Sequence, residues 1–481
     1  MDIITYEQFG AAGDGRTDDM PAVVKAHEEA NRLGLPVRAR EGACYYIAPI
    51  ARCAVIRTDT DWTGASFRID DRDLDNYRLP LFDLPPEGEE RPFPLTSLRA
   101  GEDFIPNPAG EELFVRVYND NHRDYIRLGA NQDNGHSRTD AFLVEADGTL
   151  PSPVSFDFEQ VTRSSAFPIP AKRLTLRGGI FTTIANRWES RYDYHGRNIR
   201  IRRSNTAVEG ITHYVEGEED HGAPYSGFIS ISDCAKVEVR DCLFTAHRIY
   251  WTIGSAGVPV PMGSYDINCG AAVSVSFRHC RQTTDIMDRN YWGLIGTNFC
   301  RDLTFDDCVF SRFDAHMGVT NCTIRNTKLG WQCLNAIGFG TFRIENTEAY
   351  GYAFVNLRGD YGCTFKGRFE IKNCVWHPAG KGRTVFNAGN DGTHDFGYPC
   401  WLPQEIDIDG FTVAPPEGEN AGEEIGDIWL FNDWTGKPQG EVKYPMIPPR
   451  RASVKNVCGV RSVGLCQNPE LLKETAFSCD R

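Results

Sequence analysis

Apolar and polar residues alternate along the C-terminal two-thirds of the chain in a unit that recurs seven times. The units are VEVRDCLF (237–244), VSVSFRHC (273–280), LTFDDCVF (303–310), CTIRNTKL (322–329), FRIENTEA (342–349), FEIKNCVW (369–376) and IDIDGFTV (406–413). A period of two residues predicts β-strands. The polar positions Asp307, Asn326 and Asn346 lie 19 and 20 residues apart, which suits one short coil of a solenoid. The pattern therefore predicts a stack of strands in which each coil contacts only its neighbours.

Near the N-terminus the apolar period changes from that of a strand to that of a helix. The apolar positions concerned are Ala22, Val23, Ala26, Ala30 and Leu33. They predict a helix over about residues 18–33, in which Thr17 or Asp18 can cap the first turn. A solenoid exposes the apolar interior of its terminal coils, so each end needs a cover. We therefore expect this helix to close the N-terminal end of the stack.

The region between about residues 72 and 171 departs from the repeat. It is rich in proline and glycine, and its strand-like runs 112–117 and 139–144 are separated by turn signals. This composition predicts a small inserted β-domain. The chain then divides into a capping helix with a first coil (1–71), the insertion (72–171) and the main solenoid with a closing C-terminal segment (172–481).

A short N-terminal motif adds a family resemblance. The stretch FGAAGDGRTDD (9–19) resembles the N-terminal signature of the pectate-lyase-like superfamily, and Ala22 and Ala26 extend the match. The run GACYYI (42–47) resembles the residues that lead into the first coil of that superfamily. The resemblance implies an all-β fold, a right-handed parallel β-helix. It also implies a carbohydrate-active protein, but polysaccharide lyases, glycoside hydrolases, epimerases and phage tailspikes all share the signature, so it leaves the chemistry open.

Charge and composition narrow the choice of partner. The formal net charge of −15 disfavours nucleic acid and anionic membrane, and it disfavours a strongly anionic polysaccharide unless arginines gather at the site. No run of about 18 apolar residues is present, so we expect no membrane span. The first residues lack the basic start and apolar run of a secretion signal. That predicts a cytoplasmic protein, or a secreted one whose signal has been removed.

The 16 cysteines show no CxxC pairs. Several follow a polar residue at the same place in the repeat, namely Cys234, Cys242, Cys280, Cys308, Cys322 and Cys374. Small side chains at equivalent positions of a solenoid stack inside it, so we expect buried free thiols rather than disulfides or a metal site. The sequence predicts no metal ion and no cofactor.

Counting from the polar positions of the repeat aligns candidate catalytic residues. Six or seven residues after these positions in three successive repeats stand His247, Asp285 and Asp314, flanked by Asp288 and His316. Equivalent positions of adjacent coils lie about 4.8 Å apart, so we expect a polar row. An acid and a second carboxylate are the groups that hydrolyse a glycosidic bond. Asp285, Asp314, Asp288 and His316 are therefore the candidate catalytic residues.

Aromatic and basic residues accompany this row. The runs RIYW (248–251) and RNYW (289–292) follow it on two neighbouring repeats, and Trp331 stands on a later one. Aromatic rings stack on the apolar faces of sugars, and arginines bind hydroxyl or carboxylate groups. The candidate substrate-binding residues are His247, Arg248, Trp251, Arg289, Tyr291, Trp292, Arg312, Trp331 and Arg358.

A second resemblance favours a different chemistry. The run FDAH (313–316) resembles the FDPH core of the catalytic motif in alginate C5-epimerases, but it lacks the proline, and Met317 replaces the acid that follows the histidine. The resemblance implies removal of the C5 proton of a uronate once a cation neutralises its carboxylate. Arg289, Arg312 and Arg358 are the candidate cations.

Three functions remain open. Paired carboxylates next to aromatic residues favour a glycoside hydrolase that cleaves an oligo- or polysaccharide in a lateral cleft. The second is a uronate polysaccharide lyase or C5-epimerase centred on Asp314 and His316. The third is a non-catalytic glycan-binding or tailspike-like protein. The expected partner is a carbohydrate, and the chain could also form a homo-oligomer, either a dimer or a trimer.

Overall fold

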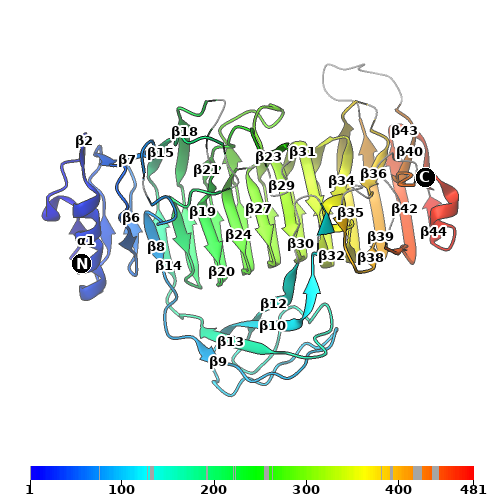
Figure 1. The fold of residues 1–481 in the computed structure, drawn as a ribbon, viewed down its shortest axis with the longest axis horizontal. Coiled ribbons are helices and arrows are strands. Elements are labelled where there is room, and N and C mark those ends of the chain that lie inside the picture. The colour runs from blue at the N-terminus through cyan, green and yellow to red at the C-terminus, as the bar shows by residue number, and fades with distance from the viewer. Residues whose placement is uncertain are drawn as a thin grey trace.

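The protein folds as a long right-handed parallel β-helix, which Figure 1 shows with the two termini at opposite ends. The structure is a computed structural model. It describes all residues except 1, 75, 127, 130–134, 191–192, 220–221, 223, 254–258, 263, 381, 390–393, 415–424, 436–443 and 481. Three parallel sheets enclose one apolar core. The fold class predicted from the sequence is confirmed.

The first sheet contains the alternating units of the sequence. Its strands are β1 (Ile4–Thr5), β3 (Val37–Arg38), β6 (Thr60–Asp61), β14 (Leu174–Arg177), β17 (Thr206–Glu209), β20 (Ala235–Arg240), β25 (Val273–Arg278), β28 (Arg301–Asp306), β30 (Val319–Arg325), β32 (Gly338–Glu345), β35 (Phe365–Pro378), β39 (Glu405–Val413), β42 (Arg451–Cys458) and β44 (Ala476–Asp480). The register stacks apolar residues inside the coil, since Leu303 pairs with Cys322, which pairs with Phe342.

The second sheet follows the first around each coil. Its strands are β2 (Asp14–Asp18), β4 (Cys44–Ile47), β7 (Ser66–Asp70), β15 (Ile180–Ile184), β18 (Thr212–Glu216), β21 (Leu243–Phe244), β26 (Arg281–Gln282), the first part of β29 (Val309–Met317), the first part of β31 (Lys328–Ala336), β33 (Glu348–Gly351) and the ends of β35, β39 and β42.

The third sheet completes the coil. Its strands are β5 (Ala54–Val55), β8 (Phe82–Leu84), β16 (Ile199–Ile201), β19 (Ser226–Ser232), β24 (Tyr265–Gly270), β27 (Ile295–Asn298), the second parts of β29 and β31, β34 (Ala353–Leu357), β36 (Thr384–Asn387), β40 (Ile425–Phe431) and β43 (Val460–Cys466).

The polar positions of the repeat form the corner between the first and second sheets. They adopt left-handed backbone conformations, with φ from 48° to 56° at Asp241, His279, Asp307, Asn326 and Asn346. Asn and Asp tolerate this region better than most residues because their short side chains bond locally. A single left-handed residue turns the chain from one sheet to the next, which explains why a polar residue recurs once per coil.

The residue after each corner points inward. It is a cysteine in part of the coils, but Thr327 and Thr347 take this position in two of them. Cys234 and Cys322 of the predicted stack follow other left-handed residues, Asp233 and Asn321. Cys242, Cys280 and Cys308 are buried in successive coils. All 16 cysteines lie in the described part of the chain and are free thiols. Burial raises the pKa of Cys333 to about 12, so a buried thiol carries little of the reactive thiolate at neutral pH.

Thiol titration checks this arrangement. In the native protein we expect fast reaction at Cys458, which is exposed, and slow reaction at the half-buried Cys44, Cys53 and Cys479. Denaturant without reductant should release all 16 thiols. A Cys458→Ser variant should lose the fast phase and nothing else. Recovery of far fewer thiols from freshly denatured protein would contradict the structure.

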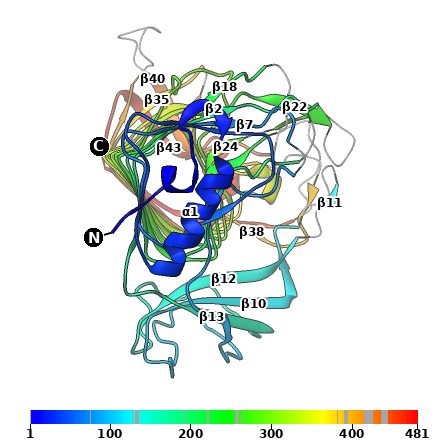
Figure 2. The same cartoon turned by 90° about the vertical axis from the view of Figure 1, so that its left-hand side faces the viewer.

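The helix α1 (Met20–Leu33) covers the N-terminal end of the stack, as Figure 2 shows from that end. Its predicted apolar face is buried, except that Leu33 is 45% exposed at the last turn. Asp18 Oδ1 accepts from Met20 N in the first turn (3.3 Å), as predicted, but the N-cap residue is Asp19. Its carboxylate accepts hydrogen bonds from Ala12 N and Gly13 N (2.6 and 3.2 Å), so this acid of the N-terminal motif closes the glycine-rich turn.

A four-stranded antiparallel sheet lies beneath the β-helix in Figure 1. Its strands are β9 (Arg91–Pro92), β10 (Leu113–Asp124), β12 (His136–Val144) and β13 (Arg163–Pro168). It has its own apolar core. A buried ion pair between Arg301 and Asp140 joins it to the β-helix. The predicted start of the insertion at residue 72 is corrected, because β8 pairs with β5 and β16 in the third sheet. The inserted segment therefore lies between residues 85 and 171.

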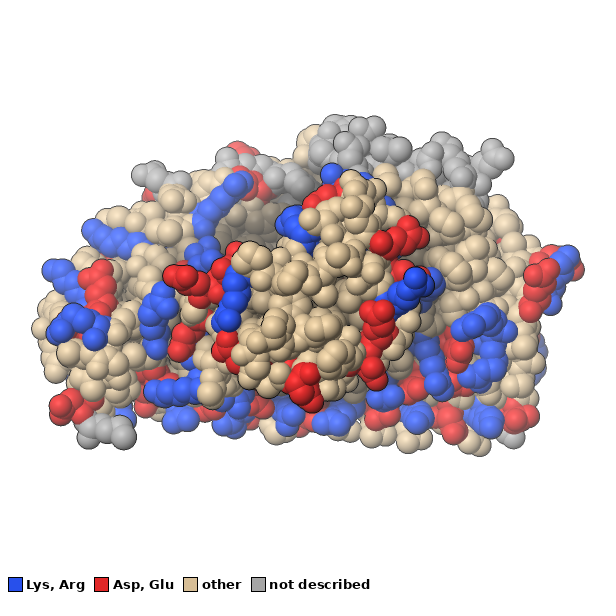
Figure 3. Space-filling view, turned by 90° about the horizontal axis from the view of Figure 1, so that it is seen from below, with Lys and Arg blue, Asp and Glu red and all other residues tan. Residues whose placement is uncertain are grey.

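The outer face of the first sheet carries alternating charges. Basic and acidic side chains pair across neighbouring strands, as in Glu209 with Arg240, Asp306 with Arg325, and Arg343 with Glu370. Figure 3 shows such alternation along one long edge of the molecule. Exposed pairs of this kind contribute little stability each. This face is neutralised by its own pairs, so the search for a site moves to the other faces.

Candidate functional site

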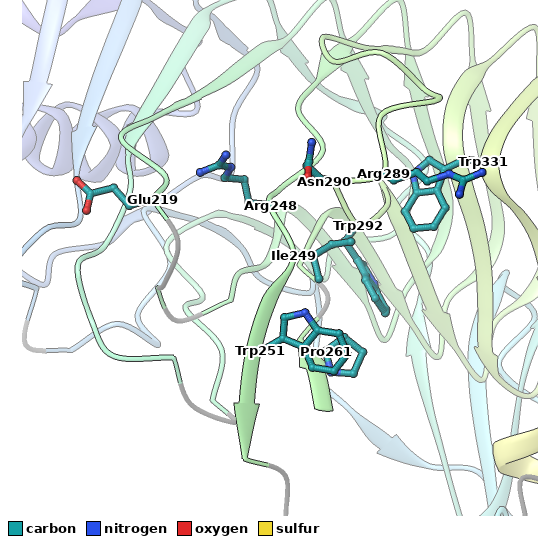
Figure 4. Close-up of a pocket in the computed structure, with 9 residues that line it drawn as sticks. All are labelled: Glu219, Arg248, Ile249, Trp251, Pro261, Arg289, Asn290, Trp292 and Trp331. Atoms are coloured by element: carbon teal, nitrogen blue, oxygen red, sulfur yellow. The ribbon is translucent and has the colours of Figure 1, made fainter. Parts of the chain in front are cut away.

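Loops between the second and third sheets build a cavity on one side of the β-helix. The hairpin β22 (Tyr250–Ile253) and β23 (Pro259–Met262) forms one wall, and the loop 283–294 forms another. The cavity has a volume of about 460 Å³ and is drawn in Figure 4. Its lining residues are Glu219, Arg248, Ile249, Trp251, Pro261, Arg289, Asn290, Trp292 and Trp331.

Backbone contacts join these two walls. Trp292 N donates to His247 O (2.8 Å), and Arg248 forms a backbone bridge with Tyr291. The runs RIYW and RNYW therefore lie side by side. Tyr291 joins the walls through its backbone and does not line the cavity. In Figure 4, Glu219 marks one end of the cavity, and Trp331 marks the other.

A second cavity of about 450 Å³ continues the first along the stack and shares Arg289 and Trp331 with it. Its lining residues are Arg289, Arg312, Trp331, Gln332, Cys333, Asn335, Gly351, Tyr352, Ala353, Asn356, Ala379 and Gly380. We call the two cavities together the lateral groove. Each falls in the size range of small-ligand sites, about 300–1,000 Å³, so the groove has room for more than one sugar ring.

A ladder of side-chain amides forms the floor of the second cavity. Asn335, Asn356 and Asn387 face one another on β31, β34 and β36. Asn356 Nδ2 donates to Asn335 Oδ1 (2.6 Å), and Asn387 Nδ2 donates to Asn356 Oδ1 (2.8 Å). Tyr352, which is 53% exposed, donates its hydroxyl to Asn356 Oδ1 (3.0 Å). Sequence reasoning missed this ladder, although the 21-residue step from Asn335 to Asn356 is one coil long.

Positive charge gathers in the groove. Arg248, Arg289 and Arg312 line it, and among the described lining residues Glu219 is the one carboxylate. The Arg312 guanidinium lies 4.7 Å from the centre of the Trp292 ring. The groove is thus locally basic in a chain whose net charge is −15. The local cluster of arginines required for an anionic polysaccharide is present.

Asp314 lies beneath the groove and is fully buried. It accepts hydrogen bonds from Arg312 (2.8 Å), from Arg358 (2.8 and 2.9 Å) and from the Tyr265 hydroxyl (2.7 Å). Burial alone would raise its pKa, but Arg312 and Arg358 outweigh burial and hold the pKa of Asp314 well below its ordinary value. A carboxylate that stays charged between two guanidinium groups is poorly suited to donate a proton. Arg358 also holds Asp360 of η2 (Gly359–Tyr361), at 2.7 Å.

The predicted row of His247, Asp285 and Asp314 does not form. Asp314 pairs in register with Gly296 of the previous coil and Asn335 of the next. In β29 the strand runs from the second sheet to the third without a loop, whereas twelve residues, 283–294, separate these sheets one coil earlier. An equal count from the corner therefore ends on the third sheet in one coil and in a loop in the other.

Asp285 and Asp288 belong to turns of that loop. Asp285 Oδ1 accepts from Met287 N (2.9 Å), and Asp288 Oδ1 accepts from Asn290 N (2.9 Å). Neither residue lines either cavity of the groove. The loop itself contacts the groove, because Ile286 O accepts from Trp331 N (3.1 Å).

His316 lies on the far side of Asp314 from the groove. Its Nδ1 is 2.9 Å from Asn298 Oδ1, and its Nε2 is 3.3 Å from the Tyr361 hydroxyl. It does not line the groove. The side chains of Arg312, Asp314 and His316 thus alternate along β29 on the outer face of the third sheet, while Phe313 and Ala315 fill the core.

His247 is buried in a chain of charged groups behind the cavity wall. It contacts Glu218 (2.8 Å) and Asp266 (3.2 Å), and Asp266 contacts His213 (2.8 Å). Burial alone would lower the pKa of His247, but Glu218 and Asp266 raise it to about 10. Glu218 also accepts from Arg248 N (3.0 Å). His247 therefore holds the wall that carries Arg248 in place, and the candidate role in substrate contact is not supported by its burial.

We expect protein stability to fall as the pH rises above about 6.5, the ordinary pKa of histidine. The pKa of His247 is higher in the folded state, so its contribution is complete below that pH and is lost as the pH approaches 10. Urea midpoints measured between pH 6 and 10 check this. A His247→Gln variant should have a flatter profile, and the exposed control His279→Gln should follow the wild type. Parallel profiles for all three would contradict the ion-pair chain.

Two further properties bear on the site. Across the described ranges, no group of three or more His, Cys, Asp and Glu side chains has the geometry of a metal site. No helix in the part of the chain that the structure describes is both long enough and apolar enough to span a membrane.

Comparison with known proteins shows the fold and nothing finer. No family model and no curated protein matches the chain. The chain shares its fold with two phage tailspikes. The tailspike gp61 of Pseudomonas phage phi297 has a TM-score of 0.54 at 14% identity, over 95% of this chain and 80% of that one. The tailspike gp49 of Pseudomonas phage LKA1 has a TM-score of 0.53 at 13% identity, over 95% and 81%.

Proposed function

We propose that this protein binds an acidic polysaccharide along the lateral groove. The observation that carries the proposal is that Arg248, Arg289 and the Asp314-paired Arg312 line a groove in which Glu219 is the one carboxylate among the described lining residues, on a protein of net charge −15. Arginine forms paired hydrogen bonds with carboxylate groups. A basic groove on an acidic protein therefore concentrates an anionic ligand at that place.

The aromatic and amide groups of the groove support the same proposal. Trp251 is 65% exposed and Tyr352 is 53% exposed at the groove, and large aromatic rings open to solvent stack on sugar faces. The amide ladder offers donors and acceptors at one-coil spacing, which suits the hydroxyl groups of successive sugars. A tailspike-like, non-catalytic protein would need only to bind its glycan, and the aromatic and amide groups of the groove suffice for that. The fold shared with phage tailspikes also supports this alternative.

Direct binding measurements test the proposal. We expect polygalacturonate, alginate or hyaluronan to bind, and dextran of similar length to bind at least tenfold more weakly. Affinity for the acidic polymer should fall as salt is raised, because the charged contacts are screened. Equal affinity for dextran and for the acidic polymers, or binding that salt does not change, would overturn the assignment.

Glycoside hydrolysis is a second candidate function. Glu219 lines the first cavity, and Asp285 and Asp288 lie on the loop that contacts Trp331. Hydrolysis needs a carboxylic acid and a second carboxylate on opposite sides of the bond. Product analysis on the polymer that binds should then show new reducing ends, and Glu219→Gln should abolish them while the variant still binds the polymer. Products that carry an unsaturated uronate would instead indicate the lyase alternative.

A further inference from the structure

A separate cavity lies where the inserted sheet meets the β-helix. It has a volume of about 220 Å³ and is lined by residues of both parts, among them Tyr125, Phe156, Phe339, Lys366, Tyr398 and Trp401. Trp401 belongs to β38 (Cys400–Trp401), which pairs with β41 (Met446–Ile447). We call this the junction cavity. Its volume is below the range of about 300–1,000 Å³ for drug-sized ligands, so it suits a single ring.

Aromatic faces dominate the junction cavity. The rings of Phe156 and Phe339 pack with centroids 4.3 Å apart across the junction. Lys366 Nζ lies 4.8 Å from the centre of the Trp401 ring. Trp401 and Tyr398 are half-buried. Phe156 and Phe339 cover each other, so the half-buried rings of Tyr398 and Trp401 supply apolar surface to the cavity, with polar groups around them, the combination that receives a ring with apolar faces and polar edges.

Tyr125 packs at the edge of the junction cavity. Its side chain is 4% exposed, and its hydroxyl has no hydrogen-bond partner among the described residues. Its backbone is left-handed, with φ of 60°, and no other non-glycine residue of the described inserted segment has a positive φ. A bulky residue in this region is strained. The Tyr125 hydroxyl is buried against Gly318 of the β-helix, so this residue packs the insertion onto the β-helix and its hydroxyl does not face the cavity.

The charges around the junction cavity largely neutralise one another. Arg138 pairs with Asp124 (3.0 Å), which His122 also contacts (3.2 Å). The remaining lining charges are Lys366, Asp157 and Glu159. Among the described lining residues, two permanent cations thus face three carboxylates, in contrast to the three arginines and one carboxylate of the lateral groove. An uncharged ligand fits this cavity better than an anionic one.

We propose that the junction cavity binds a single uncharged sugar residue. Aromatic faces contact the ring, and the carboxylates of the rim accept hydrogen bonds from its hydroxyl groups. This inference rests on the proposed function, because a protein that binds polysaccharides also encounters uncharged sugar residues. A site for one ring beside a long groove adds a second point of attachment, which raises the affinity for a polymer that reaches both.

The two sites lie on the same side of the molecule. Figure 2 shows β22 of the groove and β38 of the junction cavity on one side of the β-helix. A line of contacts crosses the outer face of the third sheet between them: Arg312 bonds Asp314, Arg358 bonds Asp314, Arg358 lies 5.7 Å from the Tyr361 ring, and Tyr361 packs on Tyr125 with ring centroids 5.9 Å apart.

Saturation-transfer NMR on the full chain tests the proposal. The probes are the methyl glycosides of glucose, galactose and N-acetylglucosamine, each uncharged. We expect at least one to receive magnetisation from the wild type. Trp401→Ala should weaken that binding about tenfold, the effect expected when a stacking surface is removed. Pro399→Trp, at an exposed lining position, should block the cavity without disturbing buried groups and should have the same effect.

The matched control is Tyr214→Ala, which removes an exposed ring of β18 that lines neither site. It should leave the methyl glycoside signal unchanged. No transfer to any probe, or equal transfer in the wild type and the Pro399→Trp variant, would overturn the inference. Either result with acidic polymer still bound at the groove leaves the proposed function standing. Loss of groove binding alone would count against the proposed function and not against the junction cavity.

Discussion

Replacing Asp314 by asparagine is expected to destabilise the protein by about 3–5 kcal/mol, the usual cost of breaking a buried ion pair by removing one partner. The change keeps the size of the side chain but removes the charge between Arg312 and Arg358, whose side chains are only 7% and 16% exposed. The guanidinium groups of Arg312 and Arg358 would then lie buried near each other without the carboxylate that neutralises them. The urea midpoint of the variant should fall markedly relative to the wild type.

We can also predict which strands of the Asp314→Asn variant lose stability first. Coils of a solenoid depend mainly on their neighbours, so hydrogen exchange should accelerate first in β27, β29, β31 and β34. The exposed control Asp285→Asn should stay within about 0.5 kcal/mol of the wild type, as surface changes usually do. A wild-type midpoint in Asp314→Asn together with loss of activity would contradict this, and would return Asp314 to the catalytic role expected from the sequence.

The direction of the pKa shift of Asp314 determines how its contribution to protein stability depends on pH. Arg312 and Arg358 hold the pKa of Asp314 below its value in the unfolded chain. Its stabilisation is therefore present above about pH 4, the ordinary pKa of aspartate, and is lost as the pH falls through the lower folded value. Between pH 5 and 8 the difference between wild type and Asp314→Asn should thus be constant, unlike the contribution of His247.

Replacing Arg289 by glutamine is expected to weaken binding of an acidic polysaccharide about 10- to 100-fold. Arg289 lines both cavities of the groove, and a hydrogen bond to a charged group contributes about 1.5–3 kcal/mol. The salt dependence of binding should also become shallower. Isothermal titration with polygalacturonate or alginate at two salt concentrations measures both effects.

Controls within the chain separate charge from stacking. Arg325→Gln removes a guanidinium from the ion-paired face of the first sheet and should leave binding unchanged. Trp331→Ala should weaken binding about tenfold, while Trp331→Phe should retain most of it, because the indole N–H has no partner among the described residues. If Arg325→Gln and Arg289→Gln weaken binding equally, the ligand responds to overall charge and the groove is not its site.

Architecture could be predicted from the chain because a β-helix is periodic. Each coil repeats the same alternation, and each corner needs a residue that accepts a left-handed backbone, so Asp307, Asn326 and Asn346 mark the coils in the sequence itself. The capping helix and the strands of the insertion follow from equally local signals. The aromatic and basic runs 248–251 and 289–292 were also placed correctly beside each other, since both follow equivalent corners.

Which residues form the site depends on contacts between distant parts of the chain, and a local sequence pattern does not contain them. Counting from the corners placed Asp285 and Asp314 in one row, but the connections between the second and third sheets differ in length from coil to coil, so the two residues do not stack in the structure. Whether a carboxylate is free or neutralised depends on which arginines the coils bring to it: Arg358 reaches Asp314 across 44 residues. The junction cavity depends on docking of Tyr125 against a loop more than 270 residues later. Local order follows from the repeat of the chain, whereas burial, charge pairing and cavities arise when variable loops and the insertion pack against the solenoid.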